Sequence, residues 1–139
     1  MLVYLVRHGE AVSENKDPAR PLTERGRLEV EKTAKALLAE GAKVDEIWHS
    51  TKLRAKQTAQ IISRILNVAV VIEKDGLKPN DLVSPIADLI VESDKTILIA
   101  GHLPFLSKLM SLMRTGDEER EEVGFKTGGV ERVLLPKDV

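Results

Sequence analysis

Short apolar runs alternate with amphipathic helical patterns along this chain, and that alternation restricts its fold more than any other feature. Strands that alternate with helices form β-α-β units, in which helices cover both faces of a largely parallel sheet. We therefore predict an α/β protein, a single-domain three-layer α/β/α sandwich with a mostly parallel central sheet. The expected strands are residues 1–6, 44–49, 68–72, 96–100 and 130–135.

The first two helices are predicted from capping residues and from apolar residues at helical spacing. Thr23 is a suitable N-cap for a helix that ends near Glu40, and Gly41 follows as its stop. Ser50 or Thr51 is expected to cap the second helix. The residues expected on the buried faces are Val30, Ala34, Leu37 and Leu38 in the first helix and Ala55, Thr58, Ala59, Ile62, Ile65 and Leu66 in the second.

Two further helices are expected in the second half of the chain. One covers residues 81–92, and the other begins at or just after Pro104, a residue suited to a first helical position, and ends at Gly116. Gly128 and Gly129 predict a turn into the last strand, which such a turn allows to run antiparallel. The residues expected on the buried faces are Leu82, Ile86, Leu89 and Ile90 in the third helix and Phe105, Leu106, Leu109, Met110 and Met113 in the fourth.

The composition excludes several classes of function. A length of 139 residues is that of one domain, which we take to be residues 1–139. The absence of cysteine excludes disulfides, thiolate metal sites and a cysteine nucleophile. A net charge of −1 and 3% aromatic residues argue against nucleic-acid binding, and the apolar N-terminal run is too short for a signal peptide or a membrane span. We expect a cytoplasmic protein that binds neither nucleic acid nor a membrane.

Polar residues gather after three of the predicted strands. Arg7, His8 and Gly9 follow the first strand, Arg54 comes shortly after the second, and His102 follows the fourth. In open α/β sheets, ligands bind beyond the carboxyl ends of the strands, near a switch in strand order. We therefore expect these residues to meet in one site.

These residue types suit the binding of a tetrahedral dianion. The guanidinium groups of Arg7 and Arg54 can each donate two hydrogen bonds to phosphate oxygens, and they stay charged. Their charges also favour the neutral ring of His8, which a nucleophile requires. His102 can donate a hydrogen bond to a phosphoryl oxygen, and Gly9 would leave room for substrate beside the backbone. The sequence thus predicts a phosphoryl-transfer site with His8 as the nucleophile.

Four segments match, in order, the motifs of a known family. They are RHG at residues 7–9, RPLTERG at residues 20–26, RAKQTA at residues 54–59 and GHLP at residues 101–104. The chain resembles the histidine phosphatase superfamily. Within that superfamily it is similar to the SixA-type phosphohistidine phosphatases, because it is short and contains the RPLT segment.

This resemblance implies a phosphoglycerate-mutase-like fold and a mechanism. The mechanism forms a phosphorylated intermediate at His8, in a phosphate pocket made by Arg7, Arg54 and His102. The resemblance also implies that Arg20 contacts the substrate.

No metal and no cofactor are expected in this site. The chain has no H-x-H or H-E-x-x-H spacing, and the arginines would repel a cation. The remaining histidine, His49, is expected to be a packing residue.

The proton donor for the leaving group is the open point of this prediction. Larger members of the family place an acid directly after the second histidine, but here that position is Leu103. The candidates for the proton donor are therefore Glu10 and Asp81. Without a strong acid, phosphohistidine and aryl phosphates are better substrates than alkyl phosphates. We expect a metal-independent phosphatase for phosphohistidine in a protein, such as a histidine-phosphotransfer protein. The alternatives are a broad-specificity phosphomonoesterase for small phosphorylated substrates, a phosphoglycerate-mutase-like enzyme, and a non-catalytic module that binds phosphoryl groups.

Overall fold

The computed structural model of the chain describes residues 1–135, and within them five strands form one sheet in the order β3-β2-β4-β1-β5. The first four strands run parallel, and β5 pairs with β1 in the antiparallel direction. The predicted α/β class and mostly parallel sheet are confirmed. The strands are β1 (Leu2–Arg7), β2 (Glu46–His49), β3 (Val70–Glu73), β4 (Ile97–Gly101) and β5 (Val130–Leu134).

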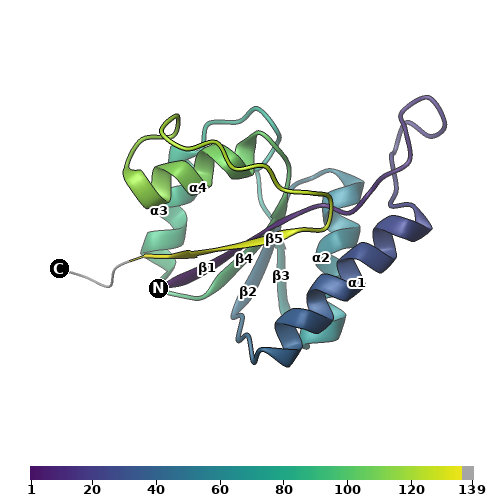
Figure 1. Cartoon of the computed structure of the whole chain (residues 1–139), viewed down its shortest axis with the longest axis horizontal. Helices are drawn as coiled ribbons and strands as arrows, with labels where there is room; N and C mark the ends of the chain where they lie inside the picture. The colour runs from purple at the N-terminus through teal and green to yellow at the C-terminus, as the bar shows by residue number, and fades with distance from the viewer. Residues whose placement is uncertain (136–139) are drawn as a thin grey trace.

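Helices cover both faces of this sheet, as Figure 1 shows. The helices are α1 (Glu24–Ala39), α2 (Leu53–Leu66), α3 (Ser84–Ser93) and α4 (Phe105–Thr115). Successive strand residues point to opposite faces, so Tyr4 and Val6 pack with α1 and α2, whereas Val3 and Leu5 pack with α3 and α4. The predicted three-layer sandwich is therefore confirmed. None of the helices within residues 1–135 is long and apolar enough to cross a membrane.

β1 and β4 lie side by side at the point where the connections of the sheet change direction. From β1 the chain passes through α1 to β2, whereas from β4 it passes through α4 to β5 on the opposite side. Such a switch leaves a crevice between the loops at the carboxyl ends of the two strands. The crevice lies beyond Arg7 and Gly101, where the sequence predicts the site.

The starts of the first two helices agree only in part with the sequence prediction. Thr23 caps α1 as predicted, because its Oγ1 accepts a hydrogen bond from the Gly26 N–H at 2.9 Å. The prediction of Ser50 or Thr51 as the cap of α2 is wrong. Lys52 occupies that position and makes no capping hydrogen bond with its side chain. The hydroxyl of Ser50 is used elsewhere, as described below.

Three residues that were predicted to face the core are exposed. Leu38 is 54% exposed, Leu82 is 76% exposed and Leu89 is 41% exposed. Leu38 and Leu89 flank the buried stripes of their helices. Leu82 lies outside α3, which begins later than predicted. Apolar periodicity located these helices but overestimated the width of their buried faces.

Candidate active site

His8 and His102 meet at the switch in strand order. Their ring centroids are 5.1 Å apart with an interplanar angle of 55°, and the two side chains belong to residues that are 8% and 1% exposed. The His8 N–H donates a hydrogen bond of 2.9 Å to the carbonyl of Gly101, which joins the loop after β1 to the end of β4. The two histidines predicted for the site are therefore neighbours in one buried place.

The hydrogen bonding of His8 defines which ring nitrogen is free. Nδ1 of His8 lies 2.7 Å from the carbonyl oxygen of Gly9. A carbonyl oxygen can only accept, so Nδ1 carries the hydrogen and Nε2 keeps its lone pair. Burial lowers the pKa of His8 to about 4, and the charges of Arg54, Arg7 and Arg20 act in the same direction. At neutral pH His8 is an uncharged imidazole with an available Nε2.

His102 is held by Ser50, which directly follows the neighbouring strand β2. Oγ of Ser50 lies 2.6 Å from Nε2 of His102, and Ser50 is fully buried at the end of β2. Nδ1 of His102 is buried and has no hydrogen-bond partner among the described residues. The pKa of His102 is lowered to about 3, chiefly by burial and in addition by the charges of His8, the neighbouring arginines and Lys52.

Arg7 is anchored by the segment that leads into β5. Its Nη1 donates a hydrogen bond of 2.8 Å to the carbonyl of Phe125, and its backbone N–H donates to the carbonyl of Gly129 at 3.0 Å. Nε of Arg7 is buried and has no partner among the described residues. One edge of the guanidinium is therefore fixed by the protein, while Nε still needs an acceptor.

Arg54 lies in the first turn of α2 and, like Arg7, has a guanidinium nitrogen that lacks a hydrogen-bond acceptor among the described residues. Its Nε is buried without a hydrogen-bond partner among residues 1–135. Burial and the charge of Arg20 both lower the pKa of Arg54, so two guanidinium groups lie close together. The first turn of a helix also disfavours a cation. An anion bound between the two arginines would relieve both unfavourable effects.

Arg20 reaches the same place from the loop before α1. Its backbone adopts a φ of 51°, in the left-handed region, and its Nε donates a hydrogen bond of 3.1 Å to the carbonyl of Val12. Arg20 and Arg54 line one cavity. The structure therefore brings Arg20 together with the other predicted site residues.

Gly9 lets the loop after β1 pack closely against α1. A Cβ at Gly9 would lie 2.6 Å from the carbonyl oxygen of Gly26 and 2.9 Å from Cγ2 of Val30. The close approach that the structure shows at Gly9 is to α1, and the role of Gly9 in leaving room for substrate stays a prediction. The Gly9 N–H donates to Oγ1 of Thr58, which ties the loop to α2 as well.

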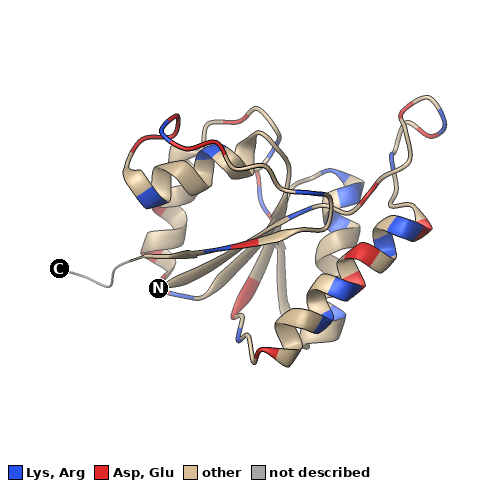
Figure 2. Cartoon of the chain, in the orientation of Figure 1, with Lys and Arg blue, Asp and Glu red and all other residues tan. Residues whose placement is uncertain are grey.

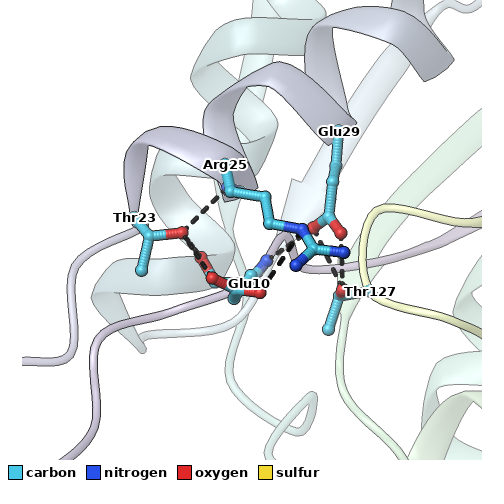
Figure 3. A network of polar contacts seen from close by, with 6 residues as sticks. Glu10, Thr23, Arg25, Glu29 and Thr127 are labelled. Atoms are coloured by element: carbon cyan, nitrogen blue, oxygen red, sulfur yellow. Dashed lines mark hydrogen bonds and ion pairs between the residues drawn. The ribbon is translucent and has the colours of Figure 1, made fainter.

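Neither candidate for the proton donor points its carboxylate at the histidines. Oε1 of Glu10 accepts a hydrogen bond from the Thr23 hydroxyl at 3.0 Å, and Glu10 also pairs with Arg25 at 3.8 Å (Figure 3). Asp81 accepts from the N–H of Lys78 within its own turn. In the part of the chain that the structure describes, both carboxylates are engaged in local structure.

Figure 3 also shows a residue whose importance the sequence did not reveal, Glu29 of α1. Its Oε1 accepts a hydrogen bond from the Glu10 N–H at 3.0 Å, directly after the Arg7-His8-Gly9 segment. The Thr127 hydroxyl donates to the same carboxylate, at 3.0 and 3.1 Å from its two oxygens. Glu29 thereby connects the loop after β1 with the segment before β5. In the sequence, Glu29 is one of several charged residues of the first predicted helix, and nothing distinguishes it from the others.

The described residues include several hydrogen-bond donors for a tetrahedral anion but few ligands for a metal ion. Among residues 1–135, no group of three or more His, Asp and Glu side chains is placed to hold a metal ion. Within residues 1–135, the buried side-chain nitrogens without a hydrogen-bond partner belong to Arg7, Arg54 and His102. His49 is buried, with Nδ1 2.8 Å from the Ser50 carbonyl, and this agrees with the packing role predicted for it.

Solved structures of other proteins share the fold of this chain. The structure of the protein histidine phosphatase SixA complexed with tungstate is similar, with a TM-score of 0.88 and 26% identity over 97% of this chain and 88% of that chain. The alpha-ribazole phosphatase of Shigella flexneri has a TM-score of 0.78 and 17% identity over 99% and 92% of the two chains, and this likeness concerns the fold alone. The predicted phosphoglycerate-mutase-like architecture is confirmed.

Sequence comparison gives a family and a partial relative. The mitochondrial serine/threonine-protein phosphatase Pgam5 of Drosophila simulans is 46% identical over 61 residues, which span 43% of this chain and 21% of that relative. The sequence model of the histidine phosphatase superfamily (branch 1) matches residues 3–79, more than half of the chain. The enzyme class predicted from the sequence, a phosphatase, agrees with the names of these relatives. The chain belongs to the histidine phosphatase superfamily.

Proposed function

We propose that this protein is a metal-independent phosphatase that removes the phosphoryl group of phosphohistidine in a protein, through a phosphorylated His8. One observation carries the proposal. The unprotonated Nε2 of His8 lies in a buried site where Arg7, Arg54 and His102 each keep a hydrogen-bonding nitrogen without a partner among the described residues. Tungstate, which SixA binds, is a tetrahedral oxyanion of the kind that such a site would hold.

The proposed reaction has two steps at phosphorus. In the first, the lone pair of His8 Nε2 attacks phosphorus, an N–P bond forms, and the bond from phosphorus to the substrate nitrogen breaks. That nitrogen leaves with the bonding electrons and takes a proton from water. In the second, a water molecule attacks phosphorus, the N–P bond breaks, and the electron pair returns to Nε2, while the attacking water releases a proton that neutralises the hydroxide left by the first step. Inorganic phosphate and free His8 result.

The arginines and His102 would stabilise the charge that develops in both steps. The unused guanidinium donors of Arg7 and Arg54 would bind equatorial phosphoryl oxygens, since guanidinium groups match oxyanions geometrically. Donors that are fixed before the reaction contribute most because the site need not reorganise. The anchor between Arg7 and the Phe125 carbonyl provides such fixation.

Ser50 would define the proton position on His102. The Ser50 hydroxyl oxygen accepts a hydrogen bond from the Lys52 N–H. Among the described residues, Nε2 of His102 is the acceptor that the Ser50 O–H can reach. If Ser50 donates to Nε2, the neutral ring carries its hydrogen on Nδ1. That N–H is the donor that His102 would offer to a phosphoryl oxygen.

The leaving group in this proposal must be a good one. Leu103 follows His102, and the carboxylates of Glu10 and Asp81 are engaged elsewhere. An imidazole nitrogen departs from phosphorus with little assistance, whereas an alkoxide requires a strong acid. The site therefore favours phosphohistidine and aryl phosphates over alkyl phosphates, and its likeness to SixA over 88% of that chain supports the same substrate class.

A phosphoserine or phosphothreonine protein is the second candidate substrate. The 46% identity to Pgam5 over 61 residues favours it, although the match spans about a fifth of that relative. Peptides that carry phosphoserine or phosphohistidine at the same position separate the two proposals. We expect turnover of the phosphohistidine peptide to be the faster by at least tenfold.

The decisive experiment compares the native protein with His8→Ala on a phosphohistidine peptide, with and without EDTA. We expect turnover that EDTA does not change and that His8→Ala abolishes. A brief incubation followed by acid-free gel analysis should also detect an acid-labile phosphoenzyme in the native protein alone. Equal activity of His8→Ala, with an unfolding midpoint close to that of the native protein, would rule out the mechanism.

A further inference from the structure

A cavity of about 430 Å³ opens beside the candidate active site, on the side of α2. Arg20 and Arg54 of the active site line it together with Thr51 and Lys52 before α2, and Glu14 also belongs to its lining. Its volume falls within the range of ligand-binding sites and exceeds what a single phosphoryl group occupies. The phosphatase mechanism proposed above assigns no role to Lys52 or to this space.

The cations of this cavity are not neutralised by the protein. In residues 1–135, no carboxylate lies within ion-pair distance of Arg20, Lys52 or Arg54, although seven ion pairs form elsewhere. Glu14 is the one acidic residue in the lining, against three cations. Lys52 and Arg20 both lower the pKa of His102, so their charges act at the active site itself. The cavity is therefore an unpaired cationic extension of the site.

A second cavity beside the site has the opposite character. It has a volume of about 520 Å³ and begins at Leu103 and Pro104, directly after His102. Its lining includes Lys108, which pairs with Glu119, and the further carboxylates of Glu118, Glu121 and Glu122. Figure 2 shows these acidic residues gathered on the loop beyond α4, away from the basic start of α2. A polypeptide that reaches both cavities would meet positive charge in the first and mainly negative charge in the second.

We propose that the cavity lined by Arg20, Lys52 and Arg54 binds carboxylate side chains of the phosphoprotein substrate, on one side of its phosphohistidine. This inference rests on the proposed function and adds the class of sequence that the enzyme selects. Lys52 is a specificity residue in this arrangement, because it contacts the flanking carboxylate and not the phosphoryl group. Complementary charges at such a rim increase the rate of association and select among partners.

Two matched substitutions on α2 test the proposal. Lys52→Glu reverses the charge in the cavity, and Lys56→Glu reverses a charge on the same helix at a residue that does not line the cavity. Both lysines are exposed, and the side chain of Lys52 makes no capping hydrogen bond, so neither substitution removes a structural contact of α2. An acidic side chain at a helix start is favourable for stability.

The substrates are two phosphohistidine peptides that differ only in flanking Glu or Gln residues. At low ionic strength we expect the native protein to prefer the Glu-flanked peptide by about two- to fivefold in kcat/KM, the range of an exposed charge pair. Lys52→Glu should remove or reverse this preference, whereas Lys56→Glu should retain it. An equal loss for both peptides in Lys52→Glu, or an unchanged preference, would overturn the proposal.

Competition separates this inference from the proposed function. The unphosphorylated versions of the two peptides are added to the hydrolysis of an aryl phosphate, which the flanking cavity does not contact. The Glu-flanked peptide should inhibit the native protein more strongly than the Gln-flanked peptide, and Lys52→Glu should abolish the difference. If neither phosphohistidine peptide is hydrolysed, the substrate assignment fails while this measurement still reports on the cavity. Equal inhibition by both peptides would refute the cavity proposal alone.

Discussion

The hydroxyl oxygen of Ser50 lies 2.6 Å from Nε2 of His102, and both residues are buried. Ser50→Ala should therefore lower kcat by about 10- to 100-fold, because His102 then loses the partner that keeps the hydrogen on Nδ1. Nitrogen-15 NMR of the imidazole should show His102 in the Nδ1–H form in the native protein and a mixture of forms in the variant.

Ser111→Ala is the matched control for this substitution. Ser111 is fully buried, and its hydroxyl donates a hydrogen bond to the Asp117 carbonyl, away from the active site. Both variants should lose about 1–3 kcal/mol in the free energy of unfolding. A similar fall in kcat for the two variants would mean that Ser50 acts only through stability.

Arg54→Lys should reduce kcat/KM by about 100- to 1000-fold, because an ammonium cannot reproduce the fixed fork of donors. Arg64→Lys lies on the same helix, where Arg64 is exposed and pairs with Glu31, and should leave the activity unchanged. Steady-state kinetics with an aryl phosphate give both values. Activity of Arg54→Lys within threefold of the native protein would remove Arg54 from the phosphate site.

The acid limb of the activity profile should lie far below the ordinary histidine pKa of 6.5. His8 must be unprotonated to attack, and its pKa is lowered to about 4. In the native protein, kcat/KM for an aryl phosphate should hold as the pH falls through 6 and decline near pH 4. Replacing Arg54 with Gln removes one of the charges that lower this pKa, so the limb should shift to higher pH. A midpoint near 6.5 in the native protein would contradict the burial of the nucleophile.

The free energy of unfolding should fall as the pH is lowered from about 6.5 to about 4. His8 and His102 are neutral in the folded protein over this range, whereas the unfolded chain protonates them near 6.5. The unfolded state then binds more protons, so acid favours it. Urea unfolding at pH 7, 5.5 and 4.5 measures the trend. His102→Gln, which lacks one of the two groups, should show a shallower dependence.

Gly9→Ala should destabilise the protein by about 1–3 kcal/mol, because the added Cβ would overlap the carbonyl of Gly26 at 2.6 Å. The loop that carries His8 would have to move, so turnover should fall as well. Gly124→Ala is the control, since nothing lies within 4 Å of a Cβ there. Chemical unfolding and aryl phosphate kinetics check both variants. No difference between the two would mean that α1 adjusts freely.

The elements that carry the site could be predicted because the information is local. Alternating strand and helix patterns define a parallel sheet, and parallel strands end at one edge, so the meeting of His8 with His102 follows from topology. The motifs around Arg20 and Arg54 also indicate the family, because they resemble segments of the histidine phosphatase superfamily. The family and the fold predicted in this way are confirmed.

The contacts that hold the site together could not be predicted in the same way. Ser50 and His102 are 52 residues apart, and Glu29 reaches Thr127 across 98 residues. No periodicity or spacing encodes such pairs, because they depend on how the layers pack. The same reason applies to Gly9, whose close packing against α1 no local pattern indicates.

The order of synthesis gives the anchoring of Arg7 a consequence in the cell. The Phe125 carbonyl, which orients the guanidinium of Arg7, is synthesised 118 residues after Arg7 itself. The Gly128 N–H, which donates to the carbonyls of Arg7 and His8, comes later still. A nascent or truncated chain that stops before this segment would contain every proposed catalytic side chain and yet lack their support. Phosphatase activity would therefore appear only once this segment has been made and has docked against the loop after β1.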